Sequence, residues 1–386
     1  MRAWAEINLD AIKHNYNEIR RITNPKAKIM AIIKADAYGH GFEKVASVLE
    51  KCGVDALGVA TANEALEIRK SGFSLPVLIL GVTFNDEYEK LIENDISLCV
   101  SDLQNAYDIS KTAVAIGKTA KIHIKLDTGM GRIGFVCNEQ NDNVINEILE
   151  ISKLPKIKIE GIFSHFAKAD EKDPSYTHLQ FDRFIKICNS LEKEGLNIPL
   201  RHICNSGGII DYPDYHLDMV RSGIITYGLY PSEEVSKDKI NLIPAMTLKA
   251  KIIKIKEISS DSPISYGGKH IATKGQRIAT IAIGYADGFS RVLSNKAKVL
   301  VNGSFANVVG NICMDQCMID VTDITSAKCG DDVILFGFDG NNNITVESVA
   351  LLMGTINYEV VCSVTRRVPR AYIQNNQIVT VCNRLD

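Results

Sequence analysis

The amino-acid sequence predicts an α/β protein in which a (β/α)8 TIM barrel is followed by a C-terminal all-β domain. Up to about residue 235, short apolar runs typical of buried strands alternate with segments of helical periodicity. After Pro231, alternating β-type stretches follow one another with turn signals and almost no long helix. We therefore expect a barrel domain over residues 8–235 and a β-rich domain over residues 236–386, joined by a strand from residues 1–7.

Eight strand-like runs occur in the first part of the chain, the number that a TIM barrel requires. They are expected at residues 28–33, 56–60, 76–81, 96–100, 121–126, 157–163, 200–204 and 217–220. Helical patterns at 42–51, 62–70, 103–116 and 176–193 lie between them and end at or just before Gly53, Gly72, Gly117 and Gly195. An open doubly wound sheet usually has fewer strands, so eight β/α units in about 230 residues favour the barrel.

The second part of the chain has strand signals of its own. They are expected at residues 249–258, 277–283, 298–301, 307–320, 332–336 and 377–381. One helix-like piece, residues 346–352, interrupts them. Residues 2–9 also alternate in β fashion, and we expect them to add a strand to this domain.

Composition excludes several classes of function. The chain has 386 residues and a formal net charge of -2, so it lacks the excess positive charge that is typical of nucleic-acid-binding proteins. The N-terminus has charges where a signal peptide needs an apolar stretch, and ~20 apolar residues nowhere run together, so we expect a cytoplasmic protein without a membrane contact. The ten cysteines form no C-x-x-C pair, and we expect reduced thiols and no metal site.

Residues that can carry chemistry follow five of the predicted barrel strands. Lys34 follows the first strand, residues 127–132 the fifth, His165 the sixth, Ser206 the seventh and Arg221 the eighth. Because side chains at the carboxyl ends of barrel strands converge on one mouth, we expect these residues to surround one pocket. Each of them alone has a structural interpretation, as a solvated cation, a core histidine or a turn residue.

Together these residues indicate a cofactor. A lysine desolvated at the position of Lys34 can attack an aldehyde as a free amine and form a Schiff base. The small residues at 206–208 and 223–224 let backbone N–H groups approach a phosphate, which the loops after strands seven and eight commonly bind. Pyridoxal 5'-phosphate carries both the aldehyde and the phosphate that these residues call for.

Nine segments resemble alanine racemases, the fold-type III pyridoxal-phosphate-dependent amino-acid racemases. The resemblance covers nearly the whole chain, and the first segment, which contains Lys34, is specific on its own. The segments are residues 33–41, 125–132, 163–166, 205–206, 221, 265–267, 283–288, 313–315 and 358–360.

The resemblance implies the reaction and its two bases. The expected reaction is interconversion of L-alanine and D-alanine, which would supply D-alanine for cell-wall peptidoglycan. Lys34 would hold the cofactor and act as one base, and Tyr266 would act as the other base on the opposite face of Cα. In the family this tyrosine comes from the neighbouring subunit of a head-to-tail homodimer, so each active site would be shared. Residues implied to bind the cofactor are Lys34, Tyr38, His165, Ser206, Arg221, Gly223, Ile224 and Tyr358.

Further roles follow from the same resemblance. Arg221 would face the pyridine nitrogen and, because a guanidinium holds its protons, would leave that nitrogen unprotonated. Arg132 and the backbone at Met314 would hold the substrate carboxylate. Lys125 is the position that many relatives modify by carbamylation, which would let it orient Arg132 by charge-assisted hydrogen bonds.

The entry to the site and the substrate preference are also implied. Tyr285 and Asp315 are expected to support the entry. Tyr358 favours alanine, since related serine-preferring racemases tend to have a smaller, polar residue there. Asn311 is a departure, because relatives often carry arginine at this position of the entry corridor.

Two alternatives remain open from the sequence. A fold-type III amino-acid decarboxylase shares both domains but places an acidic residue at the pyridine nitrogen, where this chain has Arg221. A non-catalytic pyridoxal-phosphate carrier is a single barrel and lacks a β domain.

Overall fold

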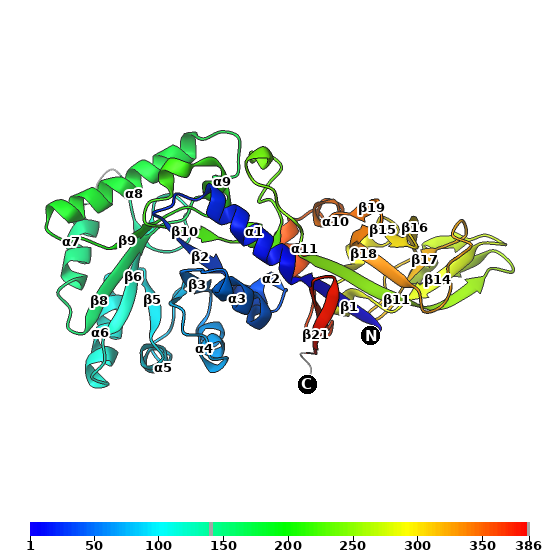
Figure 1. The fold of residues 1–386 in the computed structure, drawn as a ribbon, viewed down its shortest axis with the longest axis horizontal. Coiled ribbons are helices and arrows are strands. Elements are labelled where there is room, and N and C mark those ends of the chain that lie inside the picture. Colours follow the sequence, from blue (N-terminus) through cyan, green and yellow to red (C-terminus); the bar gives the residue numbers. More distant parts are fainter. Residues whose placement is uncertain (139–141, 384–386) are drawn as a thin grey trace. The chain divides into compact units, whose positions relative to one another are not determined.

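The computed structural model describes residues 1–138 and 142–383 (Figure 1). The chain divides into two compact units, each described here by itself. One unit holds Ile12–Ala37 and Phe42–Ile243, and the other holds Met1–Ala11, Tyr38–Gly41 and the chain from Pro244 onward. The domain boundary expected near residue 235 stays a prediction, because compactness alone does not show which part folds independently.

Eight parallel strands form the barrel of the first unit, in the order β10-β2-β3-β4-β5-β6-β8-β9. Backbone hydrogen bonds join β9 to β10, from Asp218 N to Arg201 O at 3.2 Å and from Arg221 N to Cys204 O at 3.0 Å, and so close the ring. The ring strands are β2 (Lys28–Ile32), β3 (Ala56–Val59), β4 (Val77–Ile79), β5 (Ile96–Val100), β6 (Ala120–Asp127), β8 (Ile157–Phe163), β9 (Leu200–His202) and β10 (Met219–Ser222), and β7 (Phe135–Val136) pairs with β6.

The predicted barrel is thereby confirmed, with small shifts at the strand ends. The eighth strand begins at Met219 instead of Leu217, because Leu217 has φ 50°, which no strand residue adopts. Strands such as β3 and β4 are continuous apolar runs, as expected when both faces of a parallel sheet are covered.

Helices lie around the outside of these strands (Figure 1). Their bounds are α1 (Leu9–Ile22), α2 (Lys34–Tyr38), α3 (Phe42–Lys51), α4 (Ala62–Lys70), α5 (Tyr88–Glu93), α6 (Leu103–Ala115), α7 (Asp142–Ile151), α8 (Ser175–Lys193) and α9 (Ser206–Asp211), with short 3-10 turns η1 (Pro213–Tyr215), η2 (Ile224–Tyr227) and η3 (Lys237–Lys239). α3 and α4 match the expected ranges at both ends. The glycines beyond the helix ends have positive φ, as at Gly53 (85°) and Gly195 (85°), a conformation that costs glycine little.

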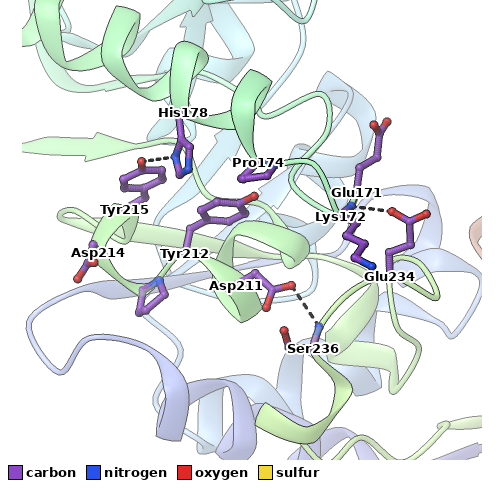
Figure 2. A pocket seen from close by; sticks show the side chains of 11 residues that line it. Glu171, Lys172, Pro174, His178, Asp211, Tyr212, Asp214, Tyr215, Glu234 and Ser236 are labelled. Atoms are coloured by element: carbon purple, nitrogen blue, oxygen red, sulfur yellow. Dashed lines mark hydrogen bonds between the residues drawn. The ribbon is translucent and has the colours of Figure 1, made fainter.

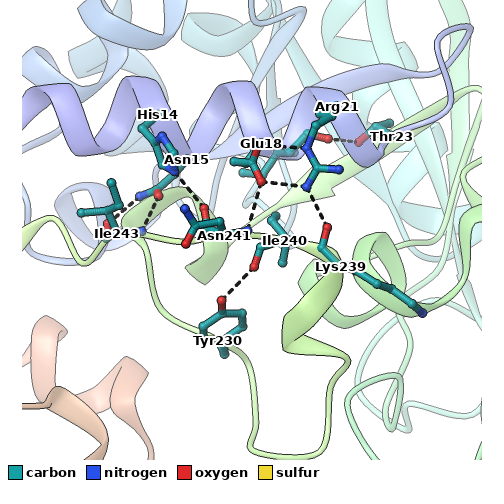
Figure 3. A network of polar contacts seen from close by, with 11 residues as sticks. His14, Asn15, Glu18, Arg21, Thr23, Tyr230, Lys239, Ile240, Asn241 and Ile243 are labelled. Carbon is teal, nitrogen blue, oxygen red and sulfur yellow. Dashed lines mark hydrogen bonds and ion pairs between the residues drawn. The ribbon is translucent and has the colours of Figure 1, made fainter.

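Helix α1 fixes the chain that leaves the barrel unit (Figure 3). Asn15 exchanges two hydrogen bonds with Ile243, from Nδ2 to its carbonyl at 2.9 Å and from its N–H to Oδ1 at 2.8 Å. Glu18 Oε2 accepts from Asn241 N at 3.0 Å, and Arg21 donates to Lys239 O at 2.8 Å. Segment 239–243 is therefore held by side chains along one face of α1.

The second unit is built on a closed ring of six antiparallel strands. Its order is β18-β15-β16-β17-β14-β11, and β11 pairs back with β18. β1, β20 and β21 extend the sheet from β11, so the expected N-terminal strand is confirmed. The strands are β1 (Ala3–Asn8), β11 (Met246–Glu257), β12 (Ser262–Ile264), β13 (His270–Ala272), β14 (Arg277–Ile281), β15 (Lys298–Val301), β16 (Ser304–Val309), β17 (Cys317–Asp320), β18 (Asp332–Asp339), β19 (Asn342–Ile344), β20 (Arg370–Gln374) and β21 (Gln377–Cys382).

The sequence did not indicate the strands β12, β13, β19 and β20, and two further features of this unit differ from the expectation. The stretch 307–320 is two strands, β16 and β17, because Gly310 at φ 75° turns the chain into a loop. A second helix, α11 (Asn357–Cys362), follows the expected α10 (Val346–Met353). The remaining short turns are η4 (Tyr266–Gly268), η5 (Tyr285–Asp287) and η6 (Arg291–Leu293).

Candidate functional site

Lys34 lies directly after β2, at the start of a left-handed turn. Residues 35–38 have φ between 50° and 55°, although none of them is glycine. This conformation costs roughly 1–2 kcal/mol per residue, so other contacts must hold it. The Glu64 carboxylate accepts from Ala35 N at 2.7 Å, and the Asp36 carboxylate accepts from Phe42 N at 2.9 Å. Lys34 is thereby presented from a rigid turn, where the sequence indicated only a glycine-rich one.

The loop after β6 is organised by the carboxylate of Asp127. It accepts from the backbone N–H groups of Gly129 and Gly131, both at 3.0 Å, and of Arg132 at 3.2 Å. Burial raises the pKa of Asp127, but these hydrogen bonds and Lys125 outweigh burial and lower it overall. An ionised carboxylate therefore fixes the backbone that carries Arg132.

Arg221 on β10 makes hydrogen bonds to protein through both of its Nη atoms. Its Nη1 donates to Nδ1 and to the carbonyl oxygen of His202, each at 3.0 Å. Its Nη2 donates to the carbonyls of Ser164 at 2.6 Å and Ile203 at 2.9 Å, and lies 3.2 Å from Nδ1 of His165. Burial lowers the pKa of Arg221 to about 10, so the guanidinium stays charged at neutral pH. These contacts use both Nη atoms and leave Nε for a ligand.

His165 is kept neutral by its surroundings. Burial, followed by the charges of Arg221, Arg132, Lys125 and Lys34, lowers its pKa well below the usual value. Because Arg221 can only donate, Nδ1 of the neutral ring accepts and Nε2 carries the proton. These four cations therefore lie near enough to His165 for their charges to lower its pKa.

Lys125 is buried inside the barrel, where its Nζ donates to Leu126 O at 2.7 Å. Burial, and next the charge of Arg221, lower its pKa to about 8. The Phe163 ring lies near both cations, with its centroid 5.3 Å from Lys125 Nζ and 5.6 Å from the Arg221 guanidinium carbon. A large share of Lys125 is thus an uncharged amine in mildly alkaline conditions, the nucleophilic form of a lysine.

Backbone donors and a hydroxyl gather after β9 and β10. Ser206 begins α9 and is buried, and its Oγ accepts from Gly223 N at 3.1 Å. Gly223 immediately precedes η2, whose first N–H groups have no intrahelical partner. A Cβ on Gly207 would lie 2.8 Å from Ala169 O, so this loop needs glycine to pack. Ser206, Gly223 and Ile224 form the end of the mouth that suits an anion.

The second unit holds the other predicted residues. The rings of Tyr38 and Tyr358 lie 6.1 Å apart at 48°, and burial raises the pKa of Tyr38. Tyr266 opens η4 with 72% of its surface exposed, and its carbonyl accepts from Asn311 Nδ2 at 2.6 Å.

Three further residues of this unit were expected at the entry or at the substrate. Met314 and Tyr285 are exposed, at 52% and 42%. The carboxylate of Asp315 pairs with Arg367 at 2.7 Å.

Sequence reasoning missed a group of buried polar residues behind these predicted ones. His123 Nδ1 lies 2.9 Å from Nε2 of His202, so the contacts of Arg221 extend inward through two histidines. Gln180 on α8 donates to His165 O at 3.0 Å and accepts from Ala167 N at 2.8 Å, which fixes the loop after β8. The only signal in the sequence was a histidine at an inward position of a predicted strand.

A separate hollow of about 820 Å³ lies on the barrel unit, lined by the ends of α8 and α9 and the segments around Glu171 and Glu234 (Figure 2). Several of its polar groups already have partners: Glu234 accepts from Lys172 N at 2.6 Å, Asp211 accepts from Ser236 N at 3.2 Å, and His178 lies 2.6 Å from the Tyr215 hydroxyl. None of the predicted site residues lines this hollow. We assign it a structural role in tying these loops together.

No helix among residues 1–138 and 142–383 has the length and apolarity to cross a membrane. In the same ranges, no group of three or more His, Cys, Asp or Glu side chains is placed to hold a metal ion.

Comparison with known proteins gives one consistent family. Residues 7–231 match the family model "Alanine racemase, N-terminal domain", and residues 245–372 match "Alanine racemase, C-terminal domain". The chain is 49% identical over 380 residues to an alanine racemase of Clostridium perfringens, covering 98% of this chain and 97% of the relative. It is 50% identical over 370 residues to one from Methanococcus maripaludis, covering 96% and 98%. The solved alanine racemase of Clostridium difficile 630 superposes with a TM-score of 0.95 at 45% identity, covering 100% of this chain and 99% of that one.

Proposed function

The chain belongs to the alanine racemase family, whose members depend on pyridoxal 5'-phosphate and interconvert L- and D-alanine, and from that premise we propose how its residues divide the work. Lys34 and Tyr266 are the two bases, and Arg221 sets the electronic character of the cofactor. The comparisons do not favour a decarboxylase or a carrier.

The barrel mouth suits this cofactor by the chemistry of its donors. It offers an amine at Lys34, a hydroxyl at Ser206, backbone N–H groups at the start of η2 and a buried guanidinium at Arg221. An aldehyde, a phosphate and a ring nitrogen can each be assigned one of these partners. When bound, pyridoxal phosphate stabilises the negative charge left on Cα after a proton is removed.

The hydrogen bonding of Arg221 is the observation that carries the proposal. Both Nη atoms are bound to protein, so the Nε–H is the donor that would meet the ring nitrogen of a bound cofactor. At a pKa of about 10 it donates a hydrogen bond without transferring the proton at neutral pH. Charge on Cα is therefore stabilised enough for proton exchange but less than with an acidic partner, which disfavours decarboxylation.

The two bases act on opposite faces of Cα. Lys34, held by its rigid turn, removes or returns the proton on one face. Tyr266 serves the other face from a second subunit, which fits its 72% exposure within its own chain. His165, with its proton on Nε2, is placed by Arg221 to donate to the tyrosine oxygen.

Binding of the substrate carboxylate falls to Arg132 and the backbone at Met314. Lys125 supports Arg132 as a carbamate, because its lowered pKa supplies the free amine that reacts with carbon dioxide. Tyr358 restricts the pocket to a small side chain, and Tyr285 and Asp315 border the entry. None of the ten cysteines, all of which lie in the described part of the chain, forms a disulfide, and we place the protein in a reducing, cytoplasmic compartment where D-alanine is made for peptidoglycan.

Subunit complementation tests the shared site. Chains carrying Lys34→Ala and Tyr266→Phe are each expected to be inactive, but mixing them after co-refolding restores about a quarter of wild-type activity, since half of the dimers are mixed and each mixed dimer has one intact site. The assay is deuterium entry at Cα of L-alanine in D2O with formation of D-alanine. No recovery in proven mixed dimers places Tyr266 in the site of its own subunit and refutes the proposal.

A further inference from the structure

A cavity of about 310 Å³ opens at the N-terminal end of the barrel strands, the end opposite the mouth that carries Lys34. Its lining comes from the first residues of the strands, and most of it is apolar, including Met30, Ala56, Val77 and Met219. A cavity of about 150 Å³ already accepts benzene, so one aromatic ring with a few further atoms fits here.

One buried imidazole ring contributes to the lining of this cavity. His123 lines the cavity with 3% of its surface exposed, and its Nδ1 is engaged by His202. Burial lowers its pKa to about 3, so the ring is neutral, and the pKa of His202 is lowered well below its usual value for the same reason. Nε2 is the nitrogen of His123 that remains for a molecule in the cavity.

The hydrogen-bond chain decides which nitrogen carries each proton. Arg221 can only donate, so Nδ1 of His202 accepts and its Nε2 carries the proton. That proton is donated to Nδ1 of His123, which leaves the proton of His123 on Nε2. The cavity therefore meets a fixed N–H donor.

The strand geometry at this point is specialised for the ring. A Cβ on Gly161 would lie 2.3 Å from His123 Nδ1, so only glycine leaves room for the imidazole. The pairing of β6 with β8 is irregular between Ile122 and His123, which leaves Glu160 as the extra residue of a bulge. Glu160 lines the cavity and is held by Ser97 at 3.2 Å and Lys158 at 2.9 Å.

We propose that this cavity is a ligand site for a small, neutral, mainly apolar molecule with one hydrogen-bond acceptor, and that its occupancy is transmitted to Arg221 through His123 and His202. The neutral character follows from the rim, where Lys28 and Lys158 are balanced by Asp55 and Glu160. An acceptor at His123 Nε2 polarises each hydrogen bond of the chain in the same sense. Only the effect on the cofactor partner rests on the proposed function; the binding site itself does not.

The probes are 4-fluoroacetophenone and 1-ethyl-4-fluorobenzene, which differ by a carbonyl in place of a methylene. We expect fluorine NMR on the holoenzyme to show saturable binding of both, with the ketone about threefold to tenfold tighter, the value of one hydrogen bond. Saturating L-alanine should not displace either probe, because the cavity lies at the opposite end of the barrel strands. Equal affinities, no saturable binding, or displacement by L-alanine would overturn the proposal.

Two variants locate the site. Ala56→Phe fills the cavity from its wall and should abolish binding of both probes, whereas His123→Phe keeps the ring shape and should abolish only the preference for the ketone. Retained probe binding in Ala56→Phe is incompatible with the proposal. If His123→Phe does not fold, Ala56→Phe alone tests whether the probes bind in this cavity. In protein with 15N-labelled histidine, the ketone should shift Nε2 of both His123 and His202, and an unmoved His202 refutes the coupling.

Discussion

Arg221 donates to Nδ1 of His202 across 3.0 Å, and this contact fixes which nitrogen carries the proton in His202 and, through it, in His123. A guanidinium has no acceptor, so His202 must accept there and carry its proton on the other nitrogen. Both rings are neutral at physiological pH because burial and the charge of Arg221 lower their pKa values. Arg221 thus sets the protonation of two histidines, His202 and His123, in addition to its proposed contact with the cofactor.

Arg221→Gln should raise the pKa of His165 and of Lys125, since the arginine charge is the second-largest cause of lowering at both. NMR titration of labelled histidine and lysine side chains measures the change. The matched control is Arg69→Gln, which removes another arginine whose Nη1 donates to backbone carbonyls, those of Phe73 at 3.0 Å and Leu75 at 2.8 Å. The control should lower stability and leave both pKa values unchanged, and a rise in both variants would contradict the assignment.

Lys34→Ala should abolish covalent attachment of the cofactor and racemisation. Borohydride treatment followed by intact-mass measurement detects attachment directly, because reduction makes the link permanent. Lys111→Ala, which removes an exposed lysine of α6, should retain both properties. Cofactor attached to the Lys34→Ala protein at another lysine, with activity retained, would falsify the role of Lys34.

Glu64→Gln should loosen the turn that follows Lys34. The carboxylate accepts from Ala35 N at 2.7 Å, Ala60 N at 2.8 Å and Thr61 N at 3.2 Å, and an amide offers one oxygen and one donor to these three donors. We expect a loss of about 1–3 kcal/mol in unfolding free energy and a lower kcat with little change in KM. Glu67→Gln, an exposed residue of the same helix, is the control. A kcat equal to that of the control contradicts the anchoring role.

Lys125 should make stability depend on pH in carbon-dioxide-free buffer. Its pKa of about 8 in the folded chain is below the unfolded value of 10.5, so between these values the unfolded chain binds more protons and stability rises with pH. Below pH 8 the full penalty of about 3 kcal/mol is present. Lys125→Met removes the buried amine, so its free energy of unfolding should lack this pH dependence. The variant should be more stable than the natural chain at pH 8, and the difference should shrink as the pH rises to 10.5. A constant difference across this range contradicts the lowered pKa.

The same amine predicts a response to bicarbonate. Carbon dioxide reacts only with uncharged Lys125, so carbamate formation falls as pH drops below about 8. Added bicarbonate should raise activity most in mildly alkaline buffer, and peptide mass measurement under gentle handling should find one carbon dioxide on Lys125. Active enzyme with Lys125 unmodified refutes the carbamate.

Local sequence patterns predicted the barrel well because apolar runs such as β5 alternate with helical segments such as α6, which ends just before Gly117. They also placed Lys34, His165 and Arg221 on one rim, since strand ends in a barrel converge by topology. They could not predict the His123–His202 contact, which joins strands 79 positions apart in the chain. Nor could they predict the left-handed turn, because Ala35 and Ala37 prefer right-handed conformations and yield only to Glu64 and the surrounding packing.

That left-handed turn has a stereochemical consequence. The conformation that costs an L-residue roughly 1–2 kcal/mol is the one that its mirror image prefers. Ala35 is exposed and has φ 50°, so a semisynthetic chain with D-alanine at this position should be more stable than the natural one. The segment that presents Lys34 is thus a stretch of L-polypeptide shaped as if it were built from the enantiomer that the enzyme produces.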